Sequence, residues 1–118
     1  MTHAELITTL AGRIREAGPE IALGELRAAH APICDPDGVV APHDTLAVFY
    51  VWAVDRLIAG GLSDLEILWH PLVDTRSPRA WWDDATLHSD AAHRSFVPST
   101  LARSGEPAPI ELRSLAAA

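Results

Sequence analysis

The stretch of residues 44–60 constrains the fold of this chain more than any other part of the sequence. Within residues 45–59 only Asp55 and Arg56 are charged, so a helix formed here is apolar over most of its circumference. At about 100° per residue, its apolar side chains fill an arc of roughly 200°. A face that wide has to be covered by other elements or by another chain. The sequence therefore predicts an all-α fold, a small helical domain around this central helix.

Capping signals predict helices on both sides of the central one, about five in all. Thr2 and Glu5 form a Thr-x-x-Glu capping box that opens an amphipathic helix over residues 2–17. A second helix is expected over residues 19–30, starting at a proline. A short fourth helix opens at a second capping box in residues 63–66.

The fifth helix is expected to start at Pro78 and to carry Trp81, Trp82 and His88. Residues 31–43 are dense in proline, glycine and aspartate, so we expect a loop there, with residues 38–41 the place for any short hairpin.

The 118 residues are expected to form one helical domain over residues 1–96, followed by an extended arm over residues 97–118. The arm contains three prolines, and its large aliphatic side chains are too widely spaced to form a core of their own. They are Leu101, Ile110, Leu112 and Leu115.

Sixteen acidic residues against nine basic ones give the chain a net charge of −7. Because no basic face emerges, binding to nucleic acid lacks its main energetic term, and anionic membrane surfaces are disfavoured. About 15 apolar residues are also too few to cross a bilayer, which needs about 20. The N-terminal sequence lacks the pattern of a secretory signal, and Cys34 is the single cysteine. We therefore expect a cytoplasmic protein.

The stretch of residues 83–93 is the best candidate for a metal site, since it is rich in imidazole and carboxylate groups. Asp84 and His88 are four residues apart and share one helix face. His93 lies about 140° from His88 around a continuous helix. The three candidate ligands Asp84, His88 and His93 therefore converge on one ion only if the helix breaks near Ser89. The other interpretation is a solvated helix face, and no cofactor is then expected.

Cys34 has histidines at positions 30 and 43 as possible bases for a thiol nucleophile. No local catalytic signature surrounds it, so an inert buried thiol is the expectation.

Adjacent tryptophans point in different directions on a helix, so at most one of Trp81 and Trp82 is expected to face the core. The other is expected to be covered, either by the arm through Leu101, Ile110 and Leu112 or by a partner. Tryptophan is enriched at interface hot spots.

These features favour a non-catalytic protein-protein interaction protein, either an accessory subunit of a complex or an inhibitor of the immunity-protein type. Its partner is expected to be another protein or a second copy of the chain. The alternative is a small metal-dependent enzyme or metal-binding protein that uses Asp84 and His88.

Overall fold

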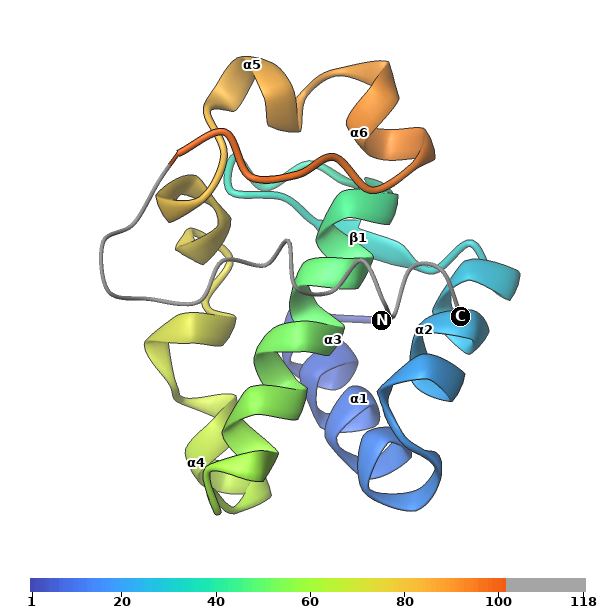
Figure 1. Cartoon of the computed structure of the whole chain (residues 1–118), viewed down its shortest axis with the longest axis vertical. Helices are drawn as coiled ribbons and strands as arrows, with labels where there is room; N and C mark the ends of the chain where they lie inside the picture. Colours follow the sequence, from blue (N-terminus) through green and yellow to red (C-terminus); the bar gives the residue numbers. More distant parts are fainter. Residues whose placement is uncertain (102–118) are drawn as a thin grey trace.

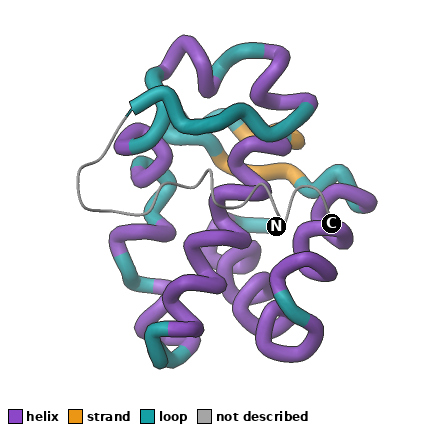
Figure 2. Tube along the Cα trace, viewed as in Figure 1, coloured by secondary structure: helices purple, strands orange, loops and turns teal. Residues whose placement is uncertain are grey.

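A computed structural model describes residues 1–101, of which 61% are helical and 6% lie in strands (Figures 1 and 2). These residues form six α-helices, two short 3-10 helices and one two-stranded hairpin. The prediction of a mostly helical chain is therefore confirmed, while the hairpin corrects the all-α description.

Helices α1 (His3–Ala17) and α2 (Pro19–Ala28) begin where the sequence predicts. The Thr2 hydroxyl accepts the backbone N–H of Glu5 at 3.1 Å, and the Glu5 carboxylate accepts the N–H of Thr2, so both bonds of the capping box form. Gly18 separates the two helices with a φ of 93°, a conformation that side chains other than glycine adopt at a cost.

Strands β1 (Pro32–Cys34) and β2 (Val40–Pro42) pair antiparallel, with Ile33 opposite Ala41. The turn between them is held by a side chain, since Oδ1 of Asp35 accepts the backbone N–H groups of Asp37 and Val39 at 2.9 Å each. The region predicted as a loop therefore contains a hairpin, with β2 overlapping residues 38–41, and the Asp35 carboxylate adds to the backbone hydrogen bonds that close its turn.

Helix α3 (Asp44–Ala59) is buried on all sides over most of its length, with every residue from Thr45 to Val54 shielded from solvent. It packs against α1, α2, α6 and the 3-10 helix η1 (Pro71–Val73), and in Figure 1 it runs through the middle of the molecule. This continuous burial matches the apolar circumference of its sequence.

Helix α4 (Asp64–Leu68) lies at one end of the molecule, and α5 (Asp84–Leu87) and α6 (Asp90–Arg94) lie at the other (Figure 1). The expected single helix from Pro78 is divided into the 3-10 helix η2 (Ser77–Ala80), α5 and α6. New N-caps cause the division: the Asp83 carboxylate accepts the N–H of Thr86, and the Ser89 hydroxyl accepts the N–H of Ala92.

Candidate functional site

Both tryptophans of the adjacent pair are buried, with 2% of Trp81 and none of Trp82 exposed. The Trp81 ring meets Trp52 edge to face at 5.7 Å, and the Trp82 ring meets Phe49 in the same way at 5.6 Å. The expectation that at most one of them faces the core is wrong. They follow a 3-10 helix, so the angle of about 100° between adjacent side chains of an α-helix does not apply to them.

The first part of the predicted arm lies against this pair of tryptophans. The indole N–H of Trp82 donates to the carbonyl of Val97 at 2.9 Å, and the backbone N–H groups of Thr100 and Leu101 both lie 2.9 Å from the Trp81 carbonyl. The pair is thus covered within the chain by residues 97–101. Ile110, Leu112 and Leu115 lie outside the described residues.

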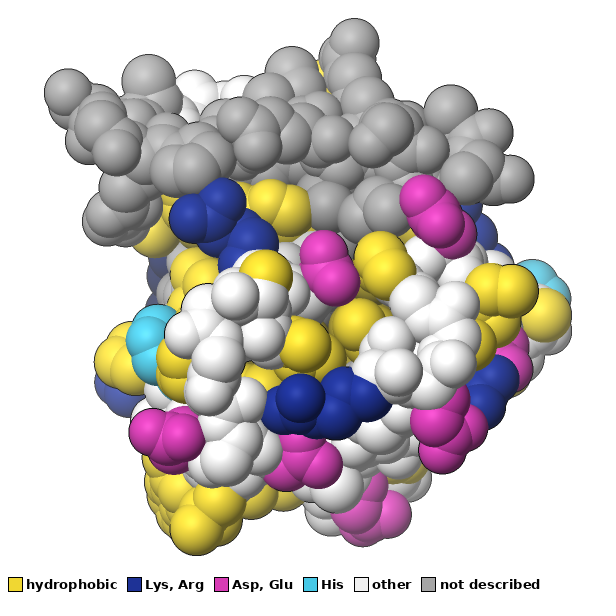
Figure 3. Space-filling view, turned by 60° about the horizontal axis from the view of Figure 1, so that its bottom comes forward, with side chains coloured by type: hydrophobic (Ala, Val, Ile, Leu, Met, Phe, Trp, Pro, Cys, Tyr) yellow, Lys and Arg dark blue, Asp and Glu magenta, His cyan; other side chains and the backbone are white. Residues whose placement is uncertain are grey.

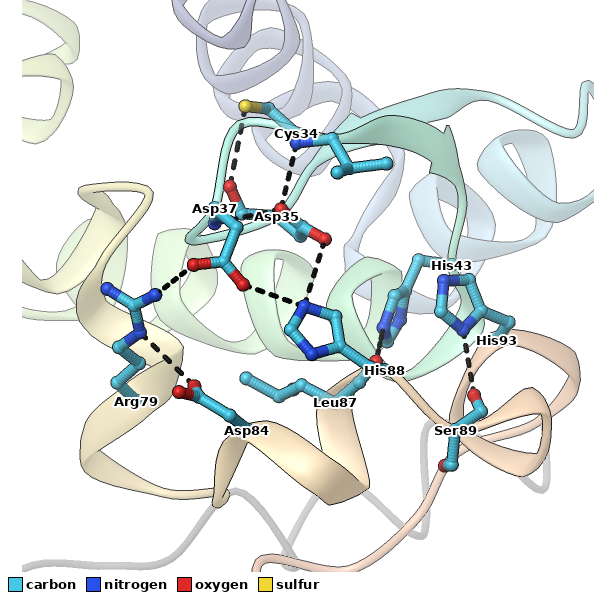
Figure 4. A network of polar contacts seen from close by, with 11 residues as sticks. Cys34, Asp35, Asp37, His43, Arg79, Asp84, Leu87, His88, Ser89 and His93 are labelled. Atoms are coloured by element: carbon cyan, nitrogen blue, oxygen red, sulfur yellow. Dashed lines mark hydrogen bonds and ion pairs between the residues drawn. The ribbon is translucent and has the colours of Figure 1, made fainter.

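The three candidate metal ligands have separate partners (Figure 4). Asp84 pairs with Arg79 at 3.2 Å, Nε2 of His88 lies 2.7 Å from the Asp37 carboxylate, and Nδ1 of His93 lies 2.8 Å from a backbone carbonyl. The helix does break near Ser89, but the break leaves these side chains apart. Within residues 1–101 no group of three or more His, Cys, Asp or Glu side chains is arranged to hold a metal ion.

The polar network around His88 joins the hairpin turn to the C-terminal helices. His88 lies 2.7 Å from Asp37 and 3.7 Å from Asp35, and Arg79 pairs with both Asp37 and Asp84 (Figure 4). These contacts of Arg79 and His88 link the hairpin turn to segments more than 40 residues later in the sequence. We therefore assign this acidic cluster to holding the turn in place.

Cys34 is half-buried, and its thiol lies 3.5 Å from the carbonyl of Asp35. His43 is not a base for it, because both ring nitrogens are already used: Nδ1 accepts the N–H of Leu46, and Nε2 lies 2.8 Å from the carbonyl of Leu87. The imidazole caps α3 and ties it to α5.

Unlike Trp81 and Trp82, Trp69 is exposed to solvent. It follows α4 and is 79% exposed. Leu65, one helical turn earlier, is 67% exposed, whereas Ile67 between them is fully buried. We call Leu65, Trp69 and the adjoining depression the Trp69 surface. The depression has a volume of about 580 Å³ and is lined in part by Leu68 and Pro71.

Figure 3 brings the α4 end of the molecule forward and shows hydrophobic atoms at the surface among arginine and carboxylate side chains. Trp69 was not among the residues that the sequence indicated as an interface. The signal was present in the spacing, since residues 65 and 69 share one helix face and Ile67 points the opposite way.

Comparison of the chain with models of protein families, with curated proteins and with solved structures found no match. Within residues 1–101 no helix is both long enough and apolar enough to cross a membrane.

Proposed function

We propose that this chain is a non-catalytic protein-protein interaction protein, an accessory subunit or an inhibitor of the immunity-protein type, that binds its partner on the Trp69 surface. The observation that carries the proposal is a tryptophan left 79% exposed beside a leucine left 67% exposed. A single exposed apolar side chain is ordinary, but two large ones four residues apart on one helix face, one of them a tryptophan, favour an interface.

The backbone of the α4 segment, which carries this tryptophan, is held by contacts with α1 and α3. Ile67 is buried in the core, and α4 packs against α1 and α3. The Arg15 guanidinium of α1 binds the Asp64 carboxylate at 2.8 Å and the carbonyl of Leu62 at 2.9 Å. Because a rigid anchor loses little conformational entropy on binding, this support favours affinity.

The charge of the chain favours a basic partner. The whole chain carries −7, and Glu66 lies on α4 beside the Trp69 surface. The backbone N–H of Ser63 bonded to the Glu66 carboxylate lowers its pKa, so this group stays ionised at neutral pH. We therefore propose a partner that presents apolar side chains flanked by Arg or Lys, whose association weakens as salt is added.

Two further features belong to the proposal. We infer that α3 organises the domain, which its burial against five other elements supports. We also place the protein in the cytoplasm, with a protein partner rather than nucleic acid or a membrane, which the net charge and the free thiol of Cys34 support.

The full chain, immobilised through its N-terminus, tests the proposal in lysate of the source organism. Trp69→Ser and Leu65→Ser are compared with Ile21→Ser, which removes an apolar side chain that is 53% exposed on α2, outside the Trp69 surface. We expect a protein retained by the unaltered chain and by Ile21→Ser but lost from both other variants. Sedimentation of the pure chain shows whether that partner is a second copy. The proposal is contradicted if all variants retain the same protein equally. It is also contradicted if no protein is retained and the pure chain is strictly monomeric.

A further inference from the structure

A cleft of about 460 Å³ opens between the end of α2, the hairpin, the start of α3 and α6. It shares no residue with the Trp69 surface. Its volume falls within the range of small-molecule sites, which are usually apolar with a few polar groups. Leu26, Ile33 and Ala47 supply the apolar part of its wall.

The polar part of the wall is basic, in contrast to the acidic chain as a whole. Two arginines and three histidines line the cleft against one carboxylate, Asp44. Arg27 already neutralises that carboxylate through two bonds, at 2.8 and 3.0 Å. Arg94 is exposed and makes no ion pair within residues 1–101. The cleft therefore has a guanidinium available for an anion.

The hydrogen bonds of two neighbouring histidines, His43 and His93, determine which of their ring nitrogens carry protons. A carbonyl oxygen only accepts, so His43 carries its proton on Nε2, toward Leu87, and His93 carries its proton on Nδ1, toward Ser89 (Figure 4). His43 uses both nitrogens, but Nε2 of His93 has no partner within residues 1–101. The ring centroids lie 4.2 Å apart, and Nε2 of His93 accepts rather than donates a hydrogen bond at the cleft.

His30 occupies a backbone position that favours glycine. It follows the C-cap of α2 with a φ of 47°, the left-handed conformation in which helices commonly place glycine. The imidazole lines the cleft and has no side-chain partner within residues 1–101. A side chain kept where glycine is favoured is a reason to look for a functional role.

We propose that this cleft binds a small organic carboxylate with an apolar body. Arg94 binds the carboxylate through charge-assisted hydrogen bonds, and His30, which also lines the cleft, donates a further one. Leu26, Ile33 and Ala47 contact the apolar body. The site is independent of the Trp69 surface, so either proposal can fail without the other.

Calorimetric titration of the full chain with octanoate tests the site, with octylammonium as the probe of opposite charge. We expect one octanoate per chain and no octylammonium. Arg94→Gln should weaken octanoate binding by at least about tenfold. The matched control is Arg76→Gln, which removes the same charge from an exposed arginine outside the cleft and should change binding less than about twofold.

His30→Gly separates a binding role from a structural one. Glycine adopts the left-handed conformation at residue 30 without strain, so this variant should unfold at a higher temperature than the unaltered chain. It should nevertheless bind octanoate more weakly, because it lacks the imidazole. A His30→Gly variant that is more stable and binds equally well contradicts the proposal. So do equal binding of octylammonium, unaltered binding by Arg94→Gln, and no octanoate binding by the unaltered chain.

Discussion

The indole N–H of Trp82 donates to the backbone carbonyl of Val97 at 2.9 Å, which joins a fully buried side chain to the segment that closes the described fold. Trp82→Phe keeps an aromatic ring but leaves that carbonyl without its donor. An unsatisfied, partly buried acceptor costs about 1–3 kcal/mol of unfolding free energy. Urea denaturation should show this loss for Trp82→Phe, whereas Trp69→Phe, at an exposed site, should stay within about 0.5 kcal/mol. Equal losses at both sites contradict the assignment.

Phe49 of α3 is fully buried and contacts three aromatic rings, those of Tyr50, Trp52 and Trp82. Phe49→Ala leaves a cavity in this part of the core, so the free energy of unfolding should fall by about 3–5 kcal/mol. Leu57→Ala, nearer the end of the same helix, should cost about 2–5 kcal/mol. Losses below about 1 kcal/mol at both positions, compared with Ile21→Ala on the surface, contradict the role of α3 as the organising element.

Burial lowers the pKa of His43, and the charge of His93 adds to this lowering. The hydrogen bond to the Leu87 carbonyl and the charge of Asp35 act in the opposite direction but are outweighed. A histidine with a lowered pKa in the folded state takes up its proton more readily when unfolded. Stability from this residue is therefore fully present above about pH 6.5 and is lost as the pH falls below that value.

His43→Asn keeps a good N-cap for α3 but cannot titrate. The free energy of unfolding, measured from about pH 7.5 to about pH 5.5, should fall less steeply in this variant than in the unaltered chain. Identical pH dependence in the two proteins shows that His43 does not carry the effect.

The carboxylate of Asp35 holds the hairpin turn through the N–H groups of Asp37 and Val39. Asp35→Ala leaves both donors without their acceptor and should cost about 1–3 kcal/mol. Asp35→Asn retains the carbonyl oxygen that accepts these bonds and should recover most of that loss. Chemical denaturation of both variants separates the hydrogen bonds of the turn from the weaker contact between Asp35 and His88. If Asp35→Asn loses as much stability as Asp35→Ala, the charge of Asp35, and not its hydrogen bonds in the turn, provides the stabilisation.

Local signals in the sequence predicted the parts of the fold that local interactions fix. The capping boxes at Thr2 and Ser63 form as expected, and α3 occupies the apolar stretch that begins after His43. The hairpin was expected only as an exception within a loop, at residues 38–41, because its strands have only three paired residues each and its turn depends on the Asp35 side chain.

The site was harder to predict than the helices, because it depends on which side chains the tertiary packing covers. Trp81 and Trp82 follow a 3-10 helix and both enter the core, a geometry that α-helical spacing does not give. The spacing of Leu65 and Trp69 places them on one helix face, but only the packing of α4 shows that this face is the exposed one. The division of the chain at residue 97 stays a prediction, and most of the proposed arm lies outside the described residues.

The dissociation constant of the purified partner, measured for the unaltered chain, Trp69→Ser and Ile21→Ser, tests the central claim most directly. Truncating a hot-spot tryptophan costs about 2 kcal/mol or more, which corresponds to at least about thirtyfold weaker binding for Trp69→Ser. Ile21→Ser should stay within about twofold of the unaltered chain, and the affinity of both should fall as salt is raised. A Trp69→Ser variant that binds as tightly as Ile21→Ser contradicts the assignment of the Trp69 surface as the interface.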